Sequence, residues 1–222
     1  MDAVTHLAHD ADFRKTTFHV IDFEGTTPTG YPPEPIEVAV VSLQHHPQQG
    51  PQPTGFRRES LMRPPAHAPV TPSVTMHTGI NAQDIENSAP ASEVLAHLDA
   101  ALPGAPAVLV AHSASVEAGF LYRYRTHCPG MAMLPVLDTI RMAKLAHPDL
   151  PAYNLDALIG HFSLPYPAAR HRAMADVEVT ALLFQRLLSH LAGSRKVTTL
   201  GDLLKRCAKP PRAAEPEQLA FG

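Results

Sequence analysis

Two carboxylates stand one residue apart at the end of a strongly β-forming run. The segment Thr17–Glu24 reads TFHVIDFE, and Asp22 and Glu24 are its only acids. Residues i and i+2 of a strand leave the same face, so both carboxylates are expected to project together above one edge of a sheet. Converging carboxylates repel each other unless a cation lies between them, and Mg²⁺ or Mn²⁺ prefers such oxygen ligands. The pair predicts a divalent-metal site; the alternative is a solvated strand end with two surface acids.

Two further acids stand near predicted helix starts. Glu117 follows the apolar run Ala107–Ala111, among small and apolar residues. An acid at this place can also simply complement the helix dipole. Asp176 lies five residues after His171, at the start of the longest helical pattern in the chain. If the chain turns into that helix at His171, Asp176 points with the other acids, and the imidazole stays on a loop, where a group that titrates near neutrality suits a general base.

The predicted secondary structure around these residues changes from strands in the first part of the chain to alternating strands and helices in the rest. The first part favours an antiparallel meander of three strands, at Thr17–Glu24, Ile36–Leu43 and Phe56–Met62, with a loop over Gln44–Thr54 and a proline-rich connection over Pro64–Pro72. The rest alternates two short strands, Ala107–Ala111 and Leu134–Leu137, with helices at Ser92–Leu102, Ser115–His127, Asp138–Ala146, Asn154–His161, Arg172–Ala192 and Thr199–Cys207. We therefore predict an α/β fold with a mixed five-stranded sheet flanked by helices.

Composition narrows the class of protein. The 222 residues carry 18 Lys and Arg against 21 Asp and Glu, a net charge of −3, and 45% of them are hydrophobic. These values exclude disorder throughout and a protein that holds nucleic acid by bulk positive charge. The longest apolar run, Ala105–Ala111, is too short to span a membrane, and Met1–Lys15 is unlike a signal peptide. We expect a cytoplasmic protein without membrane contact, in which Cys128 and Cys207 are reduced thiols.

The chain divides into three parts in this interpretation. We expect an N-terminal extension over 1–15, one domain over 16–192, and a C-terminal part over 193–222 that holds a short helix and a disordered tail rich in Pro, Ala and charge. Within that tail, Glu217–Phe221 weakly resembles the peptides by which bacterial replication proteins dock on the sliding clamp; an unstructured end is the alternative.

Taken in order, the motifs carry a family resemblance. D-x-E on the first strand, AHSASVEAGFL after a buried strand, and H-x-A-x-x-D before the long helix strongly resemble the DEDDh 3′-to-5′ exonuclease family, the type of the bacterial polymerase proofreading subunit. The resemblance runs from about Thr16 to Leu188 and includes His77-Thr78-Gly79-Ile80, Leu137-Asp138-Thr139 and Tyr153-Asn154-Leu155. The chain departs from the family with Glu117 in place of the usual Asp, Ser113 where Asn is common, and Gly25 where Thr often follows the acidic pair. The resemblance implies a ribonuclease H-like fold.

It also implies roles for individual residues. Asp22 would bridge two Mg²⁺ or Mn²⁺ ions, Glu24 and Asp176 would complete the site of one ion, Glu117 would serve the other, and His171 would deprotonate the attacking water. The residues beside these acids are candidates for contact with the terminal nucleotide: Phe23, Gly25, His112 and Ser113. For Phe23 the alternative is core packing on the opposite face of the sheet.

The activity expected from the resemblance is removal of nucleotides from the 3′ end of single-stranded DNA, in proofreading or repair, with a DNA polymerase or the sliding clamp as a possible partner. Two alternatives stay open: an exonuclease acting on RNA or oligoribonucleotides, and a catalytically silent nucleic-acid-binding module. A subset of six basic residues is expected to line the path of the strand: Arg123, Arg125, Arg141, Lys144, Arg170 and Arg172.

Overall fold

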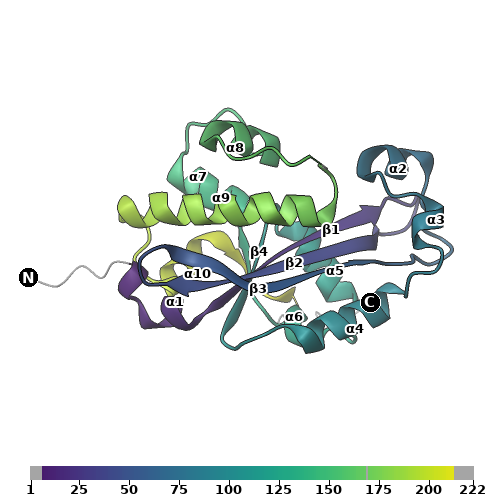
Figure 1. Ribbon diagram of the computed structural model, residues 1–222, viewed down its shortest axis with the longest axis horizontal. Coiled ribbons are helices and arrows are strands. Elements are labelled where there is room, and N and C mark those ends of the chain that lie inside the picture. Colours follow the sequence, from purple (N-terminus) through teal and green to yellow (C-terminus); the bar gives the residue numbers. More distant parts are fainter. Residues whose placement is uncertain (1–6, 169, 213–222) are drawn as a thin grey trace, which may run out of the picture.

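A mixed sheet forms the centre of the molecule. The computed structural model describes residues 7–168 and 170–212, and its six strands lie in the order β3-β2-β1-β4-β5-β6 (Figure 1). They are β1 (Thr17–Thr26), β2 (Glu34–His46), β3 (Gly50–Leu61), β4 (Ala107–Ala111), β5 (Val136–Asp138) and β6 (Ala208–Lys209). β1, β2 and β3 pair antiparallel as the predicted meander, whereas β4 runs parallel to both β1 and β5.

The α/β class is confirmed, but the predicted count of five strands is wrong by one. The sixth strand, β6, is two residues long and pairs antiparallel with β5. So short a segment carries no periodicity from which a strand can be predicted, and only its neighbour in space makes it one.

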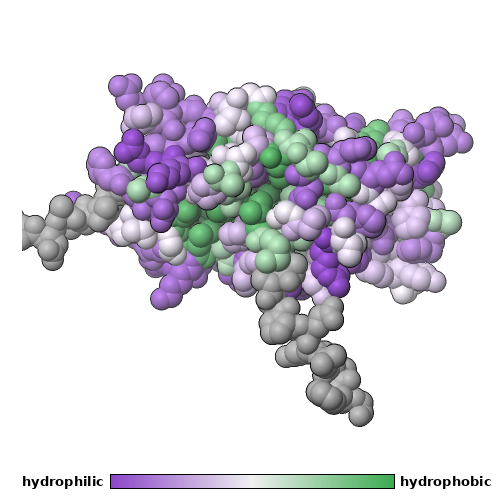
Figure 2. All heavy atoms as spheres, turned by 90° about the horizontal axis from the view of Figure 1, so that it is seen from below, coloured by the Kyte–Doolittle hydropathy of each residue, from purple (hydrophilic) through white to green (hydrophobic). Residues whose placement is uncertain are grey.

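Helices cover both faces of this sheet. α7 (Thr139–Ala146), α8 (Leu155–Phe162) and α9 (Ala173–Gly193) lie on one face, which we call the α9 face (Figure 1). α4 (Ala91–Ala101), α5 (Ser115–Arg123) and α6 (Pro129–Ala132) lie on the other. Seen from below, this second side shows hydrophobic side chains gathered near its middle and hydrophilic ones toward its ends (Figure 2).

The alternation of β1 decides which residues belong to which face. Phe18 and Val20 lie in the core beneath α9, and Ile21 and Phe23 lie in the core beneath α4 and α5. Asp22 continues the row of Phe18 and Val20 by the two-residue period of a strand, as does Glu24 beyond it. The acidic pair therefore belongs to the α9 face.

Several elements differ from the predicted bounds. The predicted loop over Gln44–Thr54 is mostly strand, because β2 continues to His46 and β3 begins at Gly50, whose φ of 72° the tight turn requires. The helices α2 (Pro72–Thr78) and α3 (Ala82–Ile85), which follow the proline-rich connection, were not predicted. They are too short to show an apolar stripe, although Thr71 caps α2 and Asn81 caps α3 through their side chains.

Both described ends of the chain pack on this domain. Leu7, in the 3₁₀ turn Leu7–His9, and Phe13, in α1 (Ala11–Lys15), are buried in the core on the α9 face. At the other end, α10 (Leu200–Cys207) begins where its Leu200 N–H donates to Asp10 Oδ2 at 2.6 Å. In residues 7–168 and 170–212, no helix has the length and apolar content to cross a membrane. The clamp-like segment Glu217–Phe221 lies outside the described residues.

Candidate active site

Four carboxylates gather where β1 ends against the start of α9. Glu24 on β1, Asp176 in the first turn of α9 and His171 just before it each offer a ligand atom, and these atoms lie within 4.8 Å of one another. Glu117 lies in the first turn of α5, and its charge acts on Asp22 together with those of Glu24 and Asp176. The three predicted segments therefore meet at one place.

Local chain geometry explains how the segments meet. β1 and β4 run parallel, so their carboxyl ends lie at the same edge of the sheet, and the chain after β4 turns directly into α5. Ser113 makes that turn with a φ of 72°, and His171 enters α9 with a φ of 63°. Both are non-glycine residues in the left-handed region, where the backbone is costly to hold, and such strain is typical of functional sites.

Burial and mutual repulsion raise the pKa values of these acids. Burial, followed by the charges of Asp176 and Glu37, raises the pKa of Glu24 to about 7. Burial, followed by the charges of Asp138 and Glu24, raises the pKa of Glu117 to about 8. The pKa of Asp22 is raised well above its ordinary value, first by burial and then by the three neighbouring acids. A cluster of this kind lacks positive charge.

The donor set fits a hard divalent cation. Glu117 Oε2 and Asp176 Oδ1 are buried and have no hydrogen-bond partner among the described residues. Carboxylate oxygens are the ligands that Mg²⁺ and Mn²⁺ prefer, and unpartnered buried oxygens are costly unless a ligand satisfies them. A divalent ion would satisfy both and offset the repulsion within the cluster.

His171 is suited to accept a proton. It is half-buried, and its ring lies 3.9 Å, centroid to centroid, from the ring of His77 at the end of α2. Burial, followed by the positive charges of His77 and Arg170, lowers the pKa of His171 below its ordinary value. This lowering of the pKa favours the neutral imidazole, the form that a general base needs.

Arginines near the acids are held by protein partners. The Arg170 guanidinium donates from Nε to Asp156 Oδ1 at 2.8 Å and pairs with Asp176 through Nη1. Arg172 pairs with Glu37. Of the six basic residues expected along the strand path, these two therefore already have internal carboxylate partners.

The residues expected to contact the nucleotide have different surroundings. Phe23 is 6% exposed and packs on Phe120, with ring centroids 5.2 Å apart. The side chain thus has the core position predicted as the alternative, because odd-numbered residues of β1 face away from α9, and a contact of Phe23 with a nucleotide stays a prediction. His112 Nδ1 lies 2.8 Å from Thr139 Oγ1, and burial lowers its pKa to about 4, so the imidazole is neutral. Contact of Gly25, His112 and Ser113 with a nucleotide stays a prediction.

Comparison with known proteins supplies the family. A family model described as an exonuclease matches residues 19–184, most of the chain. The chain belongs to the DEDDh exonuclease family. Among its relatives, the DNA polymerase III subunit epsilon-like protein of Rhodobacter capsulatus is 32% identical over 201 residues, covering 89% of this chain and 27% of the relative. DNA polymerase III PolC-type of Thermotoga petrophila is 28% identical over 210 residues, covering 90% of this chain and 14% of the relative.

The fold agrees with this family. The nuclease domain of 3′hExo, a DEDDh family member bound to rAMP, is similar with a TM-score of 0.65 and 19% identity, over 81% of this chain and 94% of that chain. This likeness confirms the ribonuclease H-like fold that the resemblance implied. The chain spans less than a third of the length of the two curated relatives.

Against the DEDDh pattern, Glu117 keeps the carboxyl group with one more methylene than Asp. It is 2% exposed and lies within the cluster, so the longer side chain does not remove the carboxylate from the site. The retained acid argues against the catalytically silent alternative.

Sequence reasoning missed three acids that act on this DEDDh site. Asp138 is buried at the end of β5, caps α7 through Ile140 N and raises the pKa of Glu117. Asp156 holds Arg170, and Glu37 holds Arg172. The Leu137-Asp138-Thr139 motif was a signal for the first, whereas Asp156 and Glu37 are single acids whose partners lie 14 and 135 residues away.

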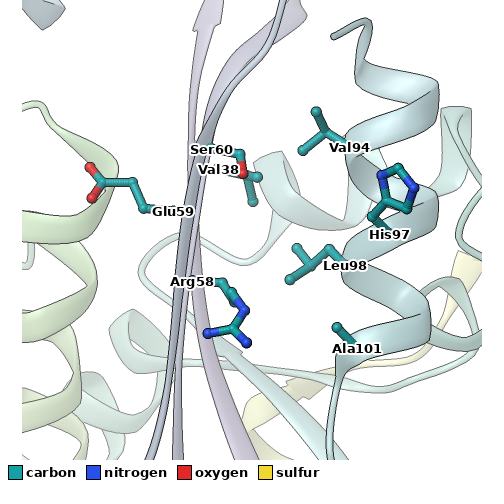
Figure 3. Close-up of a pocket in the computed structure, with 8 residues that line it drawn as sticks. All are labelled: Val38, Arg58, Glu59, Ser60, Val94, His97, Leu98 and Ala101. Atoms are coloured by element: carbon teal, nitrogen blue, oxygen red, sulfur yellow. The ribbon is translucent and has the colours of Figure 1, made fainter. Parts of the chain in front are cut away.

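A separate cavity lies away from the acids. It has a volume of about 230 Å³ between α4 and the strands β2 and β3, where Val38, Ser60 and Leu98 point into it (Figure 3). Val38 belongs to the core on the side opposite α9, so this cavity is not the nuclease site.

Proposed function

We propose that this chain is a divalent-metal-dependent 3′-to-5′ exonuclease that acts on single-stranded DNA. The observation that carries the proposal is the convergence of four buried or half-buried carboxylates with the imidazole of His171 at one edge of the sheet. Such clusters are the feature of sites that hydrolyse phosphodiesters with two metal ions.

The residues of the cluster would divide between metal binding and proton transfer. Asp22, Glu24 and Asp176 would hold one Mg²⁺ or Mn²⁺ ion, and Asp22 with Glu117 would hold a second. When bound, the ions supply the positive charge that offsets the negative charge developing on the scissile phosphate. His171 would take the proton of the attacking water, because its lowered pKa favours the neutral imidazole and the side chain is half-exposed beside Asp176. The product would be a nucleoside 5′-monophosphate.

DNA is the favoured substrate because the two curated relatives are a DNA polymerase and a protein named after a DNA polymerase subunit. The same names support a polymerase as partner. An RNA exonuclease is the second candidate, because the structural neighbour in the DEDDh family is bound to rAMP. A single contact to the 2′-hydroxyl separates these substrates.

The test is digestion of matched 5′-labelled single-stranded DNA and RNA with Mg²⁺, Mn²⁺ or EDTA. We expect a metal-dependent ladder that shortens from the 3′ end, is faster on DNA, and is lost in Asp22→Ala and His171→Ala. Asp149→Ala and His97→Ala are matched controls, because both side chains are exposed, and they are expected to keep the ladder. A folded wild type without a ladder under any metal, or a ladder that survives Asp22→Ala, would contradict the proposal.

A further inference from the structure

A buried glutamate outside the DEDDh motifs holds the start of α9. Glu37 on β2 is fully buried and lies opposite Glu24 in the antiparallel register of β1 and β2. Residues paired in this way share a face, so the Glu37 side chain also lies on the α9 face. Glu37 is not one of the four acids proposed above to hold metal ions.

Both oxygens of Glu37 are engaged by the chain that enters α9. Arg172 donates from Nη2 to Oε1 at 2.6 Å and from Nε to Oε1 at 3.1 Å and Oε2 at 3.2 Å. The backbone N–H of Ala173, the first residue of α9, donates to Oε2 at 2.8 Å. Such a fork of charge-assisted hydrogen bonds fixes orientation as well as distance.

This contact replaces the cap that α9 lacks. Arg172 is the N-cap residue, and its side chain makes no capping hydrogen bond. The first N–H groups of a helix need acceptors, and a negative charge is favourable there. Glu37 supplies both from a neighbouring strand, so the helix start is fixed to β2 rather than capped by its own residues.

The contact with Glu37 fixes the positions of two site residues, His171 and Asp176. His171 stands directly before Arg172 with a positive φ, and Asp176 lies in the first turn after it. Both reach Glu24, which is the strand partner of Glu37. An anchor at this point therefore sets the distances between β1 and the two groups that α9 brings to the site.

The ion pair between Glu37 and Arg172 also holds the positive charge of the guanidinium near the site. The charge of the Arg172 guanidinium also acts on Glu24, which lies opposite Glu37 in the β1–β2 register. Glu59 on β3 is a second acid 4.0 Å from Arg172, and its side chain points away from the cavity beneath α4 (Figure 3). Without the charge of Glu37, we expect the guanidinium to turn toward Glu24, where it would compete with a cation.

We propose that Glu37 is a positioning residue of the nuclease site: through Arg172 and the Ala173 N–H it sets the place of His171 and Asp176 and keeps the guanidinium away from Glu24. This inference rests on the function proposed for the site.

The test compares Glu37→Gln, Arg172→Gln and the double variant with wild type. We measure kcat and KM on single-stranded DNA, thermal unfolding, and Mn²⁺ binding by calorimetry without substrate. For Glu37→Gln we expect kcat to fall about tenfold or more, since displacement by about 1 Å costs on this scale. KM should stay within about twofold, and Mn²⁺ should bind several-fold more weakly. The two substitutions should be non-additive, because the groups act as a unit.

A surface pair that joins the same helix to the sheet gives the matched control. Arg57 on β3 and Glu178 on α9 are 3.1 Å apart, with side chains 53% and 57% exposed. Arg57→Gln should leave kcat and Mn²⁺ binding unchanged, because exposed pairs contribute little. If Glu37→Gln fails to fold, Glu37→Asp keeps the charge and is expected to fold with intermediate values.

The outcomes separate this inference from the proposed function. Wild-type kcat and Mn²⁺ affinity in a folded Glu37→Gln protein would overturn the positioning role, as would losses no larger than those of Arg57→Gln. If the wild type digests no nucleic acid, the proposed function fails, whereas weaker Mn²⁺ binding by Glu37→Gln would still support the anchor.

Discussion

The acids of the site are chemically unusual because burial and mutual repulsion act on them in the same direction. Glu24 and Glu117 are each less than 10% exposed and hold protons at pH values where surface glutamates are ionised. The folded chain therefore holds several carboxyl groups close together, which is unfavourable when they are ionised. The charge of Arg170 acts on the pKa of Asp22 in the opposite direction and partly offsets this repulsion. This repulsion is typical of functional sites, since a bound cation would remove it.

The first prediction is that the metal-free protein loses stability as the pH rises. The pKa of Glu24 is raised from 4.5 to about 7 and that of Glu117 from 4.5 to about 8. Between the unfolded pKa of 4.5 and these folded values, the folded state therefore binds more protons than the unfolded state. The free energy of unfolding should therefore fall from about pH 5 to about pH 8, by on the order of 1–3 kcal/mol. Urea unfolding in EDTA measures this fall, and Mg²⁺ should reverse most of it at about pH 8. A flat profile in EDTA would contradict the prediction.

The second prediction concerns opposite effects at one residue. Glu117→Gln removes a buried carboxylate but keeps its size, so it should stabilise the metal-free protein at about pH 8 by on the order of 1 kcal/mol. The same change should lower exonuclease activity by about 100-fold or more, because the residue proposed to hold a second ion loses its carboxylate. Glu93→Gln on α4 is the control. Activity that stays at the wild-type level would exclude Glu117 from the site.

At the scale of elements, the end of β1 depends on how closely its neighbours approach. The β1–β2 register shifts between Glu24 and Gly25, directly after the acidic pair. A Cβ on Gly25 would lie 2.9 Å from Phe120 Cζ and 3.1 Å from the Glu34 carbonyl oxygen. The glycine therefore lets α5 and β2 pack against the strand that carries Asp22 and Glu24.

The third prediction is that Gly25→Ala destabilises the protein by about 1–3 kcal/mol, because the backbone of β2 and a buried ring must both shift. Activity should fall as well, since Glu24 is the adjacent residue. Gly119→Ala is a matched control: it lies within α5, no atom lies within 4 Å of the added Cβ, and alanine favours helix. Guanidinium unfolding of both variants measures the difference, and equal stabilities would refute the packing argument.

At the scale of the whole molecule, segments far apart in sequence pack together in one hydrophobic core. The core on the α9 face includes Leu7 near the beginning of the described chain and Leu203 near its end. α10 packs near β5 and β6 and is joined to the N-terminal segment by the hydrogen bond from Leu200 to Asp10. Leu7 of the expected N-terminal extension and Leu203 of the expected C-terminal part therefore share one core with the expected domain over 16–192.

The fourth prediction follows from this closure. Leu203 is fully buried, so Leu203→Ala should cost about 2–5 kcal/mol in unfolding free energy and keep a single unfolding transition. Leu182→Ala on α9, where the side chain is 41% exposed, should cost less than about 1 kcal/mol. Differential scanning calorimetry measures both. An early, separate transition in Leu203→Ala would mean that α10 is not part of the cooperative unit.

The acids, the histidine and the long elements that carry them could be predicted from the order of residues alone. Asp22 and Glu24 share a face because a strand has a period of two, and α9 is long enough for its apolar period to stand out. The order of the motifs determined the family. All these signals are local in the chain, so no contact between distant residues was needed to predict them.

Folding of the whole chain determines which single residues act on the site from a distance. Glu37 is bound to Arg172, 135 residues away, and Asp156 is bound to Arg170 across a loop. It also placed Phe23 in the core and made Ala208–Lys209 a strand. Each of these depends on pairing between segments that approach only when the sheet and α9 are assembled, and a lone acid or a two-residue segment has no period that predicts its partner.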